Sequence, residues 1–166
     1  NIEEQIADYK PYNEQEAHDQ AVMRQLLATQ PDLFTRENQV VHMTASSWLL
    51  NATHDKVLMI YHNIYHSWAW TGGHADGDRD LLAVAKREAM EETGVTEIRT
   101  ISEDIFSLEI LTVDGHEKRG VYVPSHLHLN VSYLLEADEE EVLRIKPDEN
   151  SGVRWFFLEE ALAACS

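Results

Sequence analysis

The chain is poor in cysteine and in basic residues. Cys165 is the only cysteine among 166 residues, which excludes an intrachain disulfide framework and fits a reducing compartment, so we expect a cytoplasmic protein. Only 13 lysines and arginines stand against 30 aspartates and glutamates, a net charge of −17. Because so little basic surface is left to meet phosphate backbones, we expect no binding to nucleic acid or to anionic membranes.

Long apolar runs are also missing. No segment approaches the roughly 18 apolar residues that span a bilayer. The first residues include Glu3, Glu4 and Asp8 and lack the basic and apolar pattern of a secretory signal peptide. The sequence shows no internal repeat and no low-complexity linker. Its hydrophobic content of 43% is ordinary for a globular protein of this length with a sizeable core.

The spacing of apolar residues predicts the order of helices and strands. Helices are expected over residues 2–10, 14–29, 81–93, 139–145 and 158–164. Strands are expected over residues 40–50, 57–62, 65–70, 98–101, 105–113, 121–123, 127–135 and 153–157. Strands that lie before, between and after helices predict an α/β domain with a mixed sheet sandwiched between helices. We interpret residues 1–36 as a helical extension packed on a core of residues 37–166.

The most informative stretch is residues 73–95, a glycine-containing loop that leads into a helix with three clustered carboxylates. Glu88, Glu91 and Glu92 fall within an arc of roughly 100° on that helix. Like charges at this spacing destabilise a helix, and its C-terminal end disfavours them further. The cluster therefore indicates a bound cation. Because the ligands are hard oxygens, Mg²⁺ or Mn²⁺ is expected. The alternative is a solvated acidic face, which the glycine loop and the Arg-Glu-x-x-Glu-Glu-x-Gly spacing disfavour.

The same stretch resembles the Nudix hydrolase signature, G-x5-E-x7-R-E-U-x-E-E-x-G-U, in which U is an apolar residue. The matching positions are Gly73, Arg87, Glu88, Ala89, Glu91, Glu92, Gly94 and Val95. One position departs, because Arg79 stands where the family has its first glutamate. In the family that glutamate commonly pairs with the motif arginine. Arg79 cannot pair with Arg87, but Asp78 or Asp80 could take its place.

The resemblance implies a fold and a reaction. It implies the α/β/α architecture, with the N-terminal helical pair as an addition. Nudix enzymes hydrolyse a diphosphate bond in nucleoside diphosphates linked to another group, so a small phosphorylated substrate is expected, and Nudix proteins often form dimers. By position, Glu91 and Glu92 would be metal ligands, together with the backbone carbonyl of Gly73. Glu88 would be a ligand or the general base.

Residues outside the signature are further candidates. Glu149 resembles an acidic residue that, in many Nudix enzymes, joins the metal site or acts as the base; the alternative is an ordinary polar loop. His128 and Asn130 lie on the polar face of an alternating strand, which either lines a substrate cleft or faces solvent. Arg119 could reach a substrate phosphate, although such residues more often only solubilise a loop. A histidine metal site is disfavoured, because the histidines are scattered and lack zinc-like spacing with cysteine.

Two other functions compete with hydrolysis. Isopentenyl diphosphate isomerases resemble Nudix proteins but use a cysteine in the pocket, whereas Cys165 lies far from any motif. A catalytically silent module that binds a nucleotide is the second alternative. Arg79 is its only support, and the intact Glu88, Glu91 and Glu92 argue against it. Turnover that depends on Mg²⁺ would separate these functions.

Overall fold

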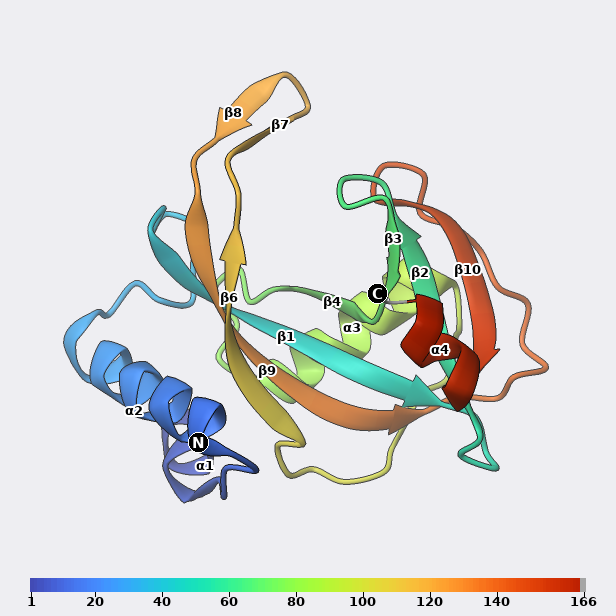
Figure 1. Cartoon of the computed structure of the whole chain (residues 1–166), viewed down its shortest axis with the longest axis horizontal. Coiled ribbons are helices and arrows are strands. Elements are labelled where there is room, and N and C mark those ends of the chain that lie inside the picture. The colour runs from blue at the N-terminus through green and yellow to red at the C-terminus, as the bar shows by residue number, and fades with distance from the viewer. Residues whose placement is uncertain (165–166) are drawn as a thin grey trace.

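A computed structural model describes residues 1–164, in which a curled sheet carries helices on both faces (Figure 1). The helices are α1 (Ile2–Asp8), α2 (Glu14–Thr29), α3 (Leu81–Thr93) and α4 (Leu158–Ala164). The strands are β1 (Val41–Leu50), β2 (Lys56–His62), β3 (Ser67–Ala69), β4 (Thr71–His74), β5 (Arg99–Thr100), β6 (Ser107–Val113), β7 (His116–Lys118), β8 (Val121–Val123), β9 (His126–Glu136) and β10 (Asn150–Phe157). This mixed sheet with helices confirms the predicted α/β class. Cys165 lies outside the described residues.

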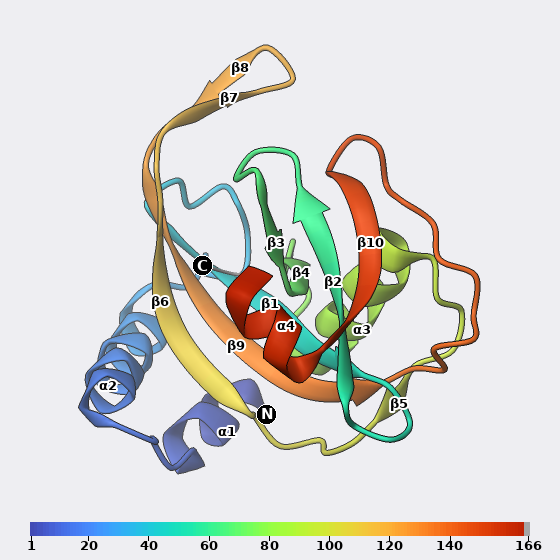
Figure 2. The same ribbon diagram turned by 45° about the vertical axis from the view of Figure 1, so that its right-hand side comes forward.

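The parallel pair of β1 and β9 forms the centre of the sheet. These strands pair over ten residues, from Val41 opposite Leu127 to Leu50 opposite Glu136. The main path of the sheet runs β10-β2-β1-β9-β5, and β3, β4 and β6 pair with β2, β1 and β9 respectively. Figure 2 shows how strongly the sheet curls, so that β6 and β10 lie on opposite sides of the domain.

Alternating side chains on the strands supply two separate apolar layers. Leu58 of β2 belongs to the main core, which also includes Val84 and Ala85 of α3. Its neighbours Val57 and Met59 belong to a second cluster beneath α4. Because successive side chains on a strand point to opposite faces, α3 and α4 cover opposite faces of the sheet. This arrangement is the predicted sandwich.

The two N-terminal helices pack on the same face of the sheet as α3. Ile6 and Met23 are fully buried in the main core beside residues of β6 and β9. The Tyr9 hydroxyl contacts the Glu16 carboxylate at 2.9 Å and the Phe106 carbonyl at 3.2 Å, which ties both helices to the start of β6. The division of the chain after residue 36 stays a prediction.

The start of α3 shows how the chain accommodates Arg79. Asp80 is the N-cap, and its side chain accepts a hydrogen bond from the Ala83 N–H. Asp78 lies 3.8 Å from Arg87 and so takes the place of the missing glutamate. The Arg79 guanidinium instead bonds Glu3 at 2.6 Å, and it lies over the Phe34 ring. Arg79 therefore links α1 to the loop before α3.

Several local predictions were wrong. Residues 139–145 form turns and irregular structure, because their polar groups bond elsewhere: the Arg144 N–H donates to the Thr93 carbonyl, and the Glu141 carboxylate accepts from Thr96. Strands β4 and β7 lie in segments predicted as loops. The chain reverses at Arg119 and Gly120, both with positive φ, as in a two-residue type I′ hairpin. Asp114-Gly115 lies between β6 and β7.

Within residues 1–164, no helix combines the length and apolar character needed to cross a membrane.

The buried side chains of the N-terminal helices yield a stability prediction. Ile6→Ala and Met23→Ala should each lower the free energy of unfolding by about 2–5 kcal/mol, because each leaves a cavity in the main core. Val22→Ala, at a 41% exposed position on the same helix as Met23, is the matched control and should change it little. Urea unfolding measures all three. Equal, small effects of the three substitutions would show that these helices do not stabilise the core.

Candidate functional site

The acidic face of α3 lies against β4, and Glu92 is its most deeply placed carboxylate. Its side chain is 3% exposed, and Oε1 accepts a hydrogen bond from the Gly72 N–H at 2.9 Å. On the other side, the Asn150 amide at the start of β10 donates to the Glu92 carbonyl at 3.0 Å. Burial raises the pKa of the Glu92 carboxyl to about 8, although the bond from Gly72 acts in the opposite direction.

Glu88 lies against the backbone of Gly73. A Cβ atom at Gly73 would lie only 2.5 Å from Cδ of Glu88, so any larger residue there would displace the Glu88 side chain. Burial, with the negative charges of Glu91 and Glu149 added, raises the pKa of the Glu88 carboxyl to about 7. The signature glycine and the signature glutamate thus meet directly.

Glu91 and Glu149 approach the same place from two different elements and share a lysine. Lys146 Nζ lies 3.6 Å from Glu91 and 3.4 Å from Glu149. Burial lowers the pKa of Lys146, but the charges of Glu149 and Glu91 outweigh it, so the net pKa is raised. Lys146 was not among the site residues predicted from the sequence. Its only signal was a lysine three residues before Glu149, which loop composition does not distinguish from a solvated charge.

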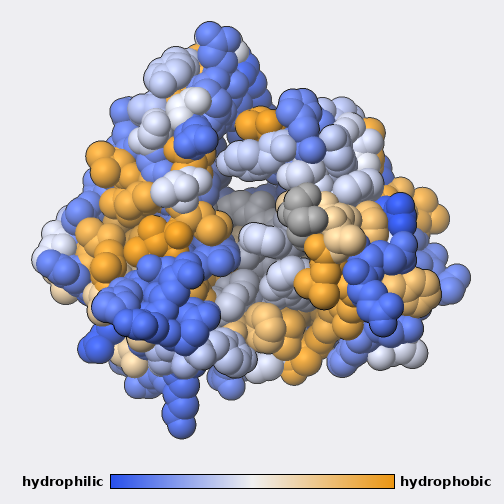
Figure 3. All heavy atoms as spheres, in the orientation of Figure 1, coloured by the Kyte–Doolittle hydropathy of each residue, from blue (hydrophilic) through white to orange (hydrophobic). Residues whose placement is uncertain are grey.

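All four glutamates line one pocket of about 830 Å³. The surface is hollowed between the β7–β8 hairpin and the segments around β3 (Figure 3). Gly72, Gly73 and Lys146 also line this pocket. The fold therefore brings the signature residues and Glu149 together, although 57 positions separate Glu149 from Glu92 in the sequence.

The other site residues predicted from the sequence differ in how they lie relative to this pocket. His128 and Asn130 both line the pocket, on the polar face of β9. The Asn130 amide is already engaged, since it accepts from Thr44 and donates to Ser46, each at 2.9 Å. Arg119 lies outside the pocket wall, at the hairpin tip, and bonds Asp148 at 2.8 Å. That contact joins the hairpin to the loop before β10.

Histidines gather at another part of the same pocket. Ligand nitrogens of His42, His74 and His128 lie within 4.8 Å of one another, and His126 is close to His128. A histidine metal site was disfavoured from the sequence because the histidines are scattered along the chain, and this group of three shows that the expectation was wrong about their arrangement. Strand pairing brings the residues together: His42 is directly opposite His128, and His74 is opposite Thr44.

Among the described residues, only the three histidines have their ligand atoms gathered closely enough for an ion. The carboxylate group nevertheless has the donor chemistry of a site for a divalent cation. Its donors are carboxylate oxygens, the ligands that Mg²⁺ and Mn²⁺ prefer. The raised pKa values of Glu88 and Glu92 mean that Lys146 and the Gly72 N–H do not fully compensate these buried charges. A doubly charged ion would favour the ionised forms. Such a site can bind phosphate groups and place a carboxylate beside an attacking water.

Comparisons with solved structures show the same fold. The C. elegans Ap4A hydrolase, in a binary complex, is 20% identical with a TM-score of 0.54, over 74% of this chain and 84% of that chain. The NUDIX domain of Shewanella oneidensis NrtR, in complex with ADP ribose, is 21% identical with a TM-score of 0.51, over 84% and 86%. The E. coli dihydroneopterin triphosphate pyrophosphohydrolase is 15% identical with a TM-score of 0.53, over 75% and 86%.

Sequence comparison identifies the family. No curated protein matched the sequence. The family profile of the NUDIX domain, however, matches residues 40–165, which is most of the chain and includes the whole acidic signature. Because the match, the fold and the signature agree, the chain belongs to the Nudix hydrolase family and acts on acid anhydrides in phosphorus-containing compounds.

Proposed function

We propose that this protein is a hydrolase that depends on Mg²⁺ or Mn²⁺ and cleaves the diphosphate bond of a nucleoside diphosphate linked to another group. The observation that best supports this proposal is that four glutamates line one pocket beside the Gly72-Gly73 backbone: Glu88, Glu91, Glu92 and Glu149. Two of these carboxyls have raised pKa values in the absence of a cation. A location in the cytoplasm and a homodimer stay predictions.

Glu91 and Glu92 are the proposed principal ligands, and Gly73 contributes its carbonyl. When bound, the cation neutralises phosphate charge and lowers the pKa of the attacking water. Glu92 is held in place by the Gly72 N–H, and Glu88 by its contact with Gly73. Either Glu88 or Glu149 accepts the proton from water, since both lie in the same pocket and are coupled by charge.

Other pocket residues suit the remainder of the substrate. Lys146 carries a positive charge beside Glu91 and Glu149, where it can contact a phosphate oxygen. His128 and Asn130 remain the proposed contacts on β9. Asn130 would have to exchange its bonds to Thr44 and Ser46 for bonds to the substrate. Arg119 bonds Asp148 through one nitrogen, which leaves its other N–H donors for a substrate phosphate.

The test is a panel of diphosphate compounds incubated with Mg²⁺ and with Mn²⁺, with product masses as the readout. The panel includes dinucleoside polyphosphates, sugar nucleotides, ADP ribose and nucleoside triphosphates. We expect cleavage of at least one nucleoside-diphosphate derivative and no cleavage with chelator present. A silent binding module, the second candidate, would bind a nucleotide without releasing products. That outcome would contradict the proposal.

Glu92→Gln tests the assigned ligand. Gln keeps an oxygen that accepts from the Gly72 N–H, so the fold should persist, as circular dichroism can verify. We expect kcat/KM to fall by at least about two orders of magnitude, because a ligand of the cation is lost. Glu97→Gln, at an exposed position after α3, is the matched control and should keep full activity. A fully active Glu92→Gln protein would refute the ligand assignment.

The raised pKa values also predict how stability depends on pH without divalent cations. Glu88 and Glu92 have pKa values of about 7 and about 8 in the folded state, against 4.5 when unperturbed. Between these limits the folded state binds more protons than the unfolded state, so stability falls as the pH rises. Urea unfolding in chelator from about pH 5 to pH 8 should show this fall, and Glu92→Gln should make it shallower.

Glu97→Gln corrects for the general effect of net charge in the same experiment. Added Mg²⁺ should offset the loss of stability at the upper end of the range, because it favours the ionised carboxylates. If Glu92→Gln and Glu97→Gln gave identical pH profiles, the raised pKa of Glu92 would not contribute to the pH dependence of stability, and the prediction would be wrong.

A further inference from the structure

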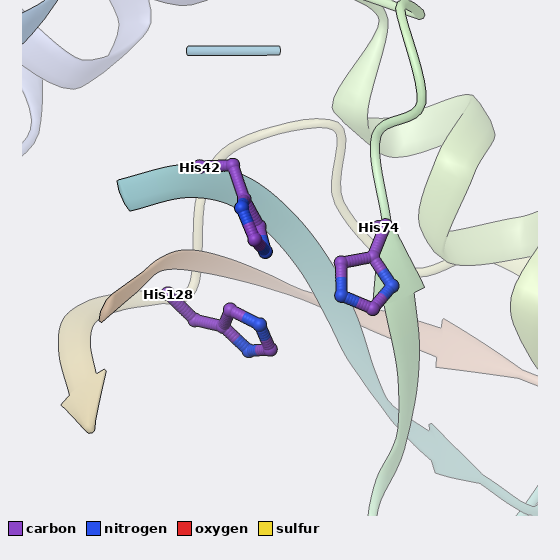
Figure 4. A group of neighbouring side chains, drawn as sticks. All are labelled: His42, His74 and His128. Carbon is purple, nitrogen blue, oxygen red and sulfur yellow. The ribbon is translucent and has the colours of Figure 1, made fainter. Parts of the chain in front are cut away.

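Three histidines from three strands turn their rings toward one space (Figure 4). His42 comes from β1, His74 from the end of β4 and His128 from β9. The ring centroids of the three pairs are 4.9–5.1 Å apart. None of these histidines occupies a defined position of the signature, although His74 directly follows its first glycine, and the proposed hydrolysis assigns no role to His42 or His74.

His42 supplies a second, independent observation. The residue is 4% exposed, and its Nε2 is buried without a hydrogen-bond partner. Its other nitrogen, Nδ1, lies 3.0 Å from the Asn38 carbonyl. A carbonyl only accepts, so Nδ1 carries the hydrogen and Nε2 presents a free lone pair. Leaving such an acceptor buried and unpaired is costly, so a ligand for it is expected.

The neighbouring histidine fixes the ring of His128 in a similar way. His126 Nδ1 lies 2.9 Å from the Pro124 carbonyl and must therefore donate to it. Its Nε2 is then an acceptor for Nε2–H of His128, at 3.0 Å. This leaves Nδ1 of His128 as the nitrogen available to a ligand. In metal sites a histidine ligand typically donates its other ring N–H to an outer group in this way.

Protonation does not satisfy the unpaired imidazole nitrogens of this group near pH 7. Burial lowers the pKa of His42, and it lowers the pKa of His128 to about 3, so both rings are neutral near pH 7. Neutral imidazole is the form that binds metal ions. Three nitrogen ligands suit zinc and its neighbours among the transition metals, whereas Mg²⁺ prefers oxygen.

We propose that His42, His74 and His128 form a transition-metal site, with Zn²⁺ as the expected ion, separate from the carboxylate site in the same pocket. Around a tetrahedral Zn²⁺, nitrogen ligands are about 3.3 Å apart. One ligand nitrogen from each ring now lies within 4.8 Å of the other two, so the rings would have to close by up to about 1.5 Å to reach this spacing. Three protein ligands leave a fourth position for water or for an anionic group of a bound molecule.

Metal binding without any activity assay tests the proposal. The metal-free protein is dialysed against Zn²⁺ in a large excess of Mg²⁺, which occupies oxygen sites, and bound zinc is counted. We expect one Zn²⁺ per chain. His74→Gln and His128→Gln should each weaken binding by about 100-fold or more. His18→Gln, at an exposed position on α2, and Glu91→Gln should leave it unchanged.

A second measurement uses the unaltered protein, since a variant in the sheet can lose its fold. Imidazole nitrogen resonances are recorded by NMR as Zn²⁺ is added, and the resonance of His42 Nε2 should shift. The proposal is overturned if no zinc binds in excess Mg²⁺ or if that resonance does not move. It is also overturned if Glu91→Gln loses zinc while the histidine variants keep it, because the ion would then lie on the carboxylates.

Discussion

The packing of α3 against β4 is the constraint on which the site depends. Gly72 donates its N–H to Glu92, and Gly73 leaves room for Glu88. This close contact removes the carboxylates of Glu88 and Glu92 from water. The backbone donor that compensates them is the Gly72 N–H, which bonds Glu92. Their pKa values of about 7 and about 8 correspond to a cost on the order of a few kcal/mol for each ionised group. The proposed divalent cation would offset that cost, and this is why we interpret the buried acidic face as a binding site.

The same pocket combines two chemically different regions. Carboxylate oxygens gather beside α3, while imidazole nitrogens gather where β1, β4 and β9 run together. Gly73 and His74 are adjacent in sequence, so β4 joins the two regions. Hard oxygen ligands and neutral nitrogen ligands select different ions.

Much of the fold followed from the sequence. The caps Asp80 and Gly94 define α3 as Leu81–Thr93, the predicted bounds, because local hydrogen bonds decide where a helix ends. Residues 139–145 were wrongly predicted as a helix, because tertiary bonds to Thr93 and Thr96 replace the helical ones. The composition of β4, Thr-Gly-Gly-His, does not indicate a strand, and only pairing with β1 makes it one.

The site, like the fold, could be predicted from the sequence only where local spacing determines it. Glu88, Glu91 and Glu92 share one helix, so their spacing alone places them on one face. The meeting of His42 with His128 depends on the register of two strands that lie 86 positions apart in sequence. Lys146 approaches Glu91 only because the loop before β10 folds back over α3. Single-sequence patterns do not report such long-range contacts.

The central claim is that the acidic face of α3 binds a divalent cation against β4. A crystal soaked in Mn²⁺ and measured for anomalous scattering tests it most directly. The account predicts an anomalous peak among the carboxylates of Glu88, Glu91 and Glu92, beside the Gly73 backbone. No peak there, with these side chains directed into solvent, would contradict the account.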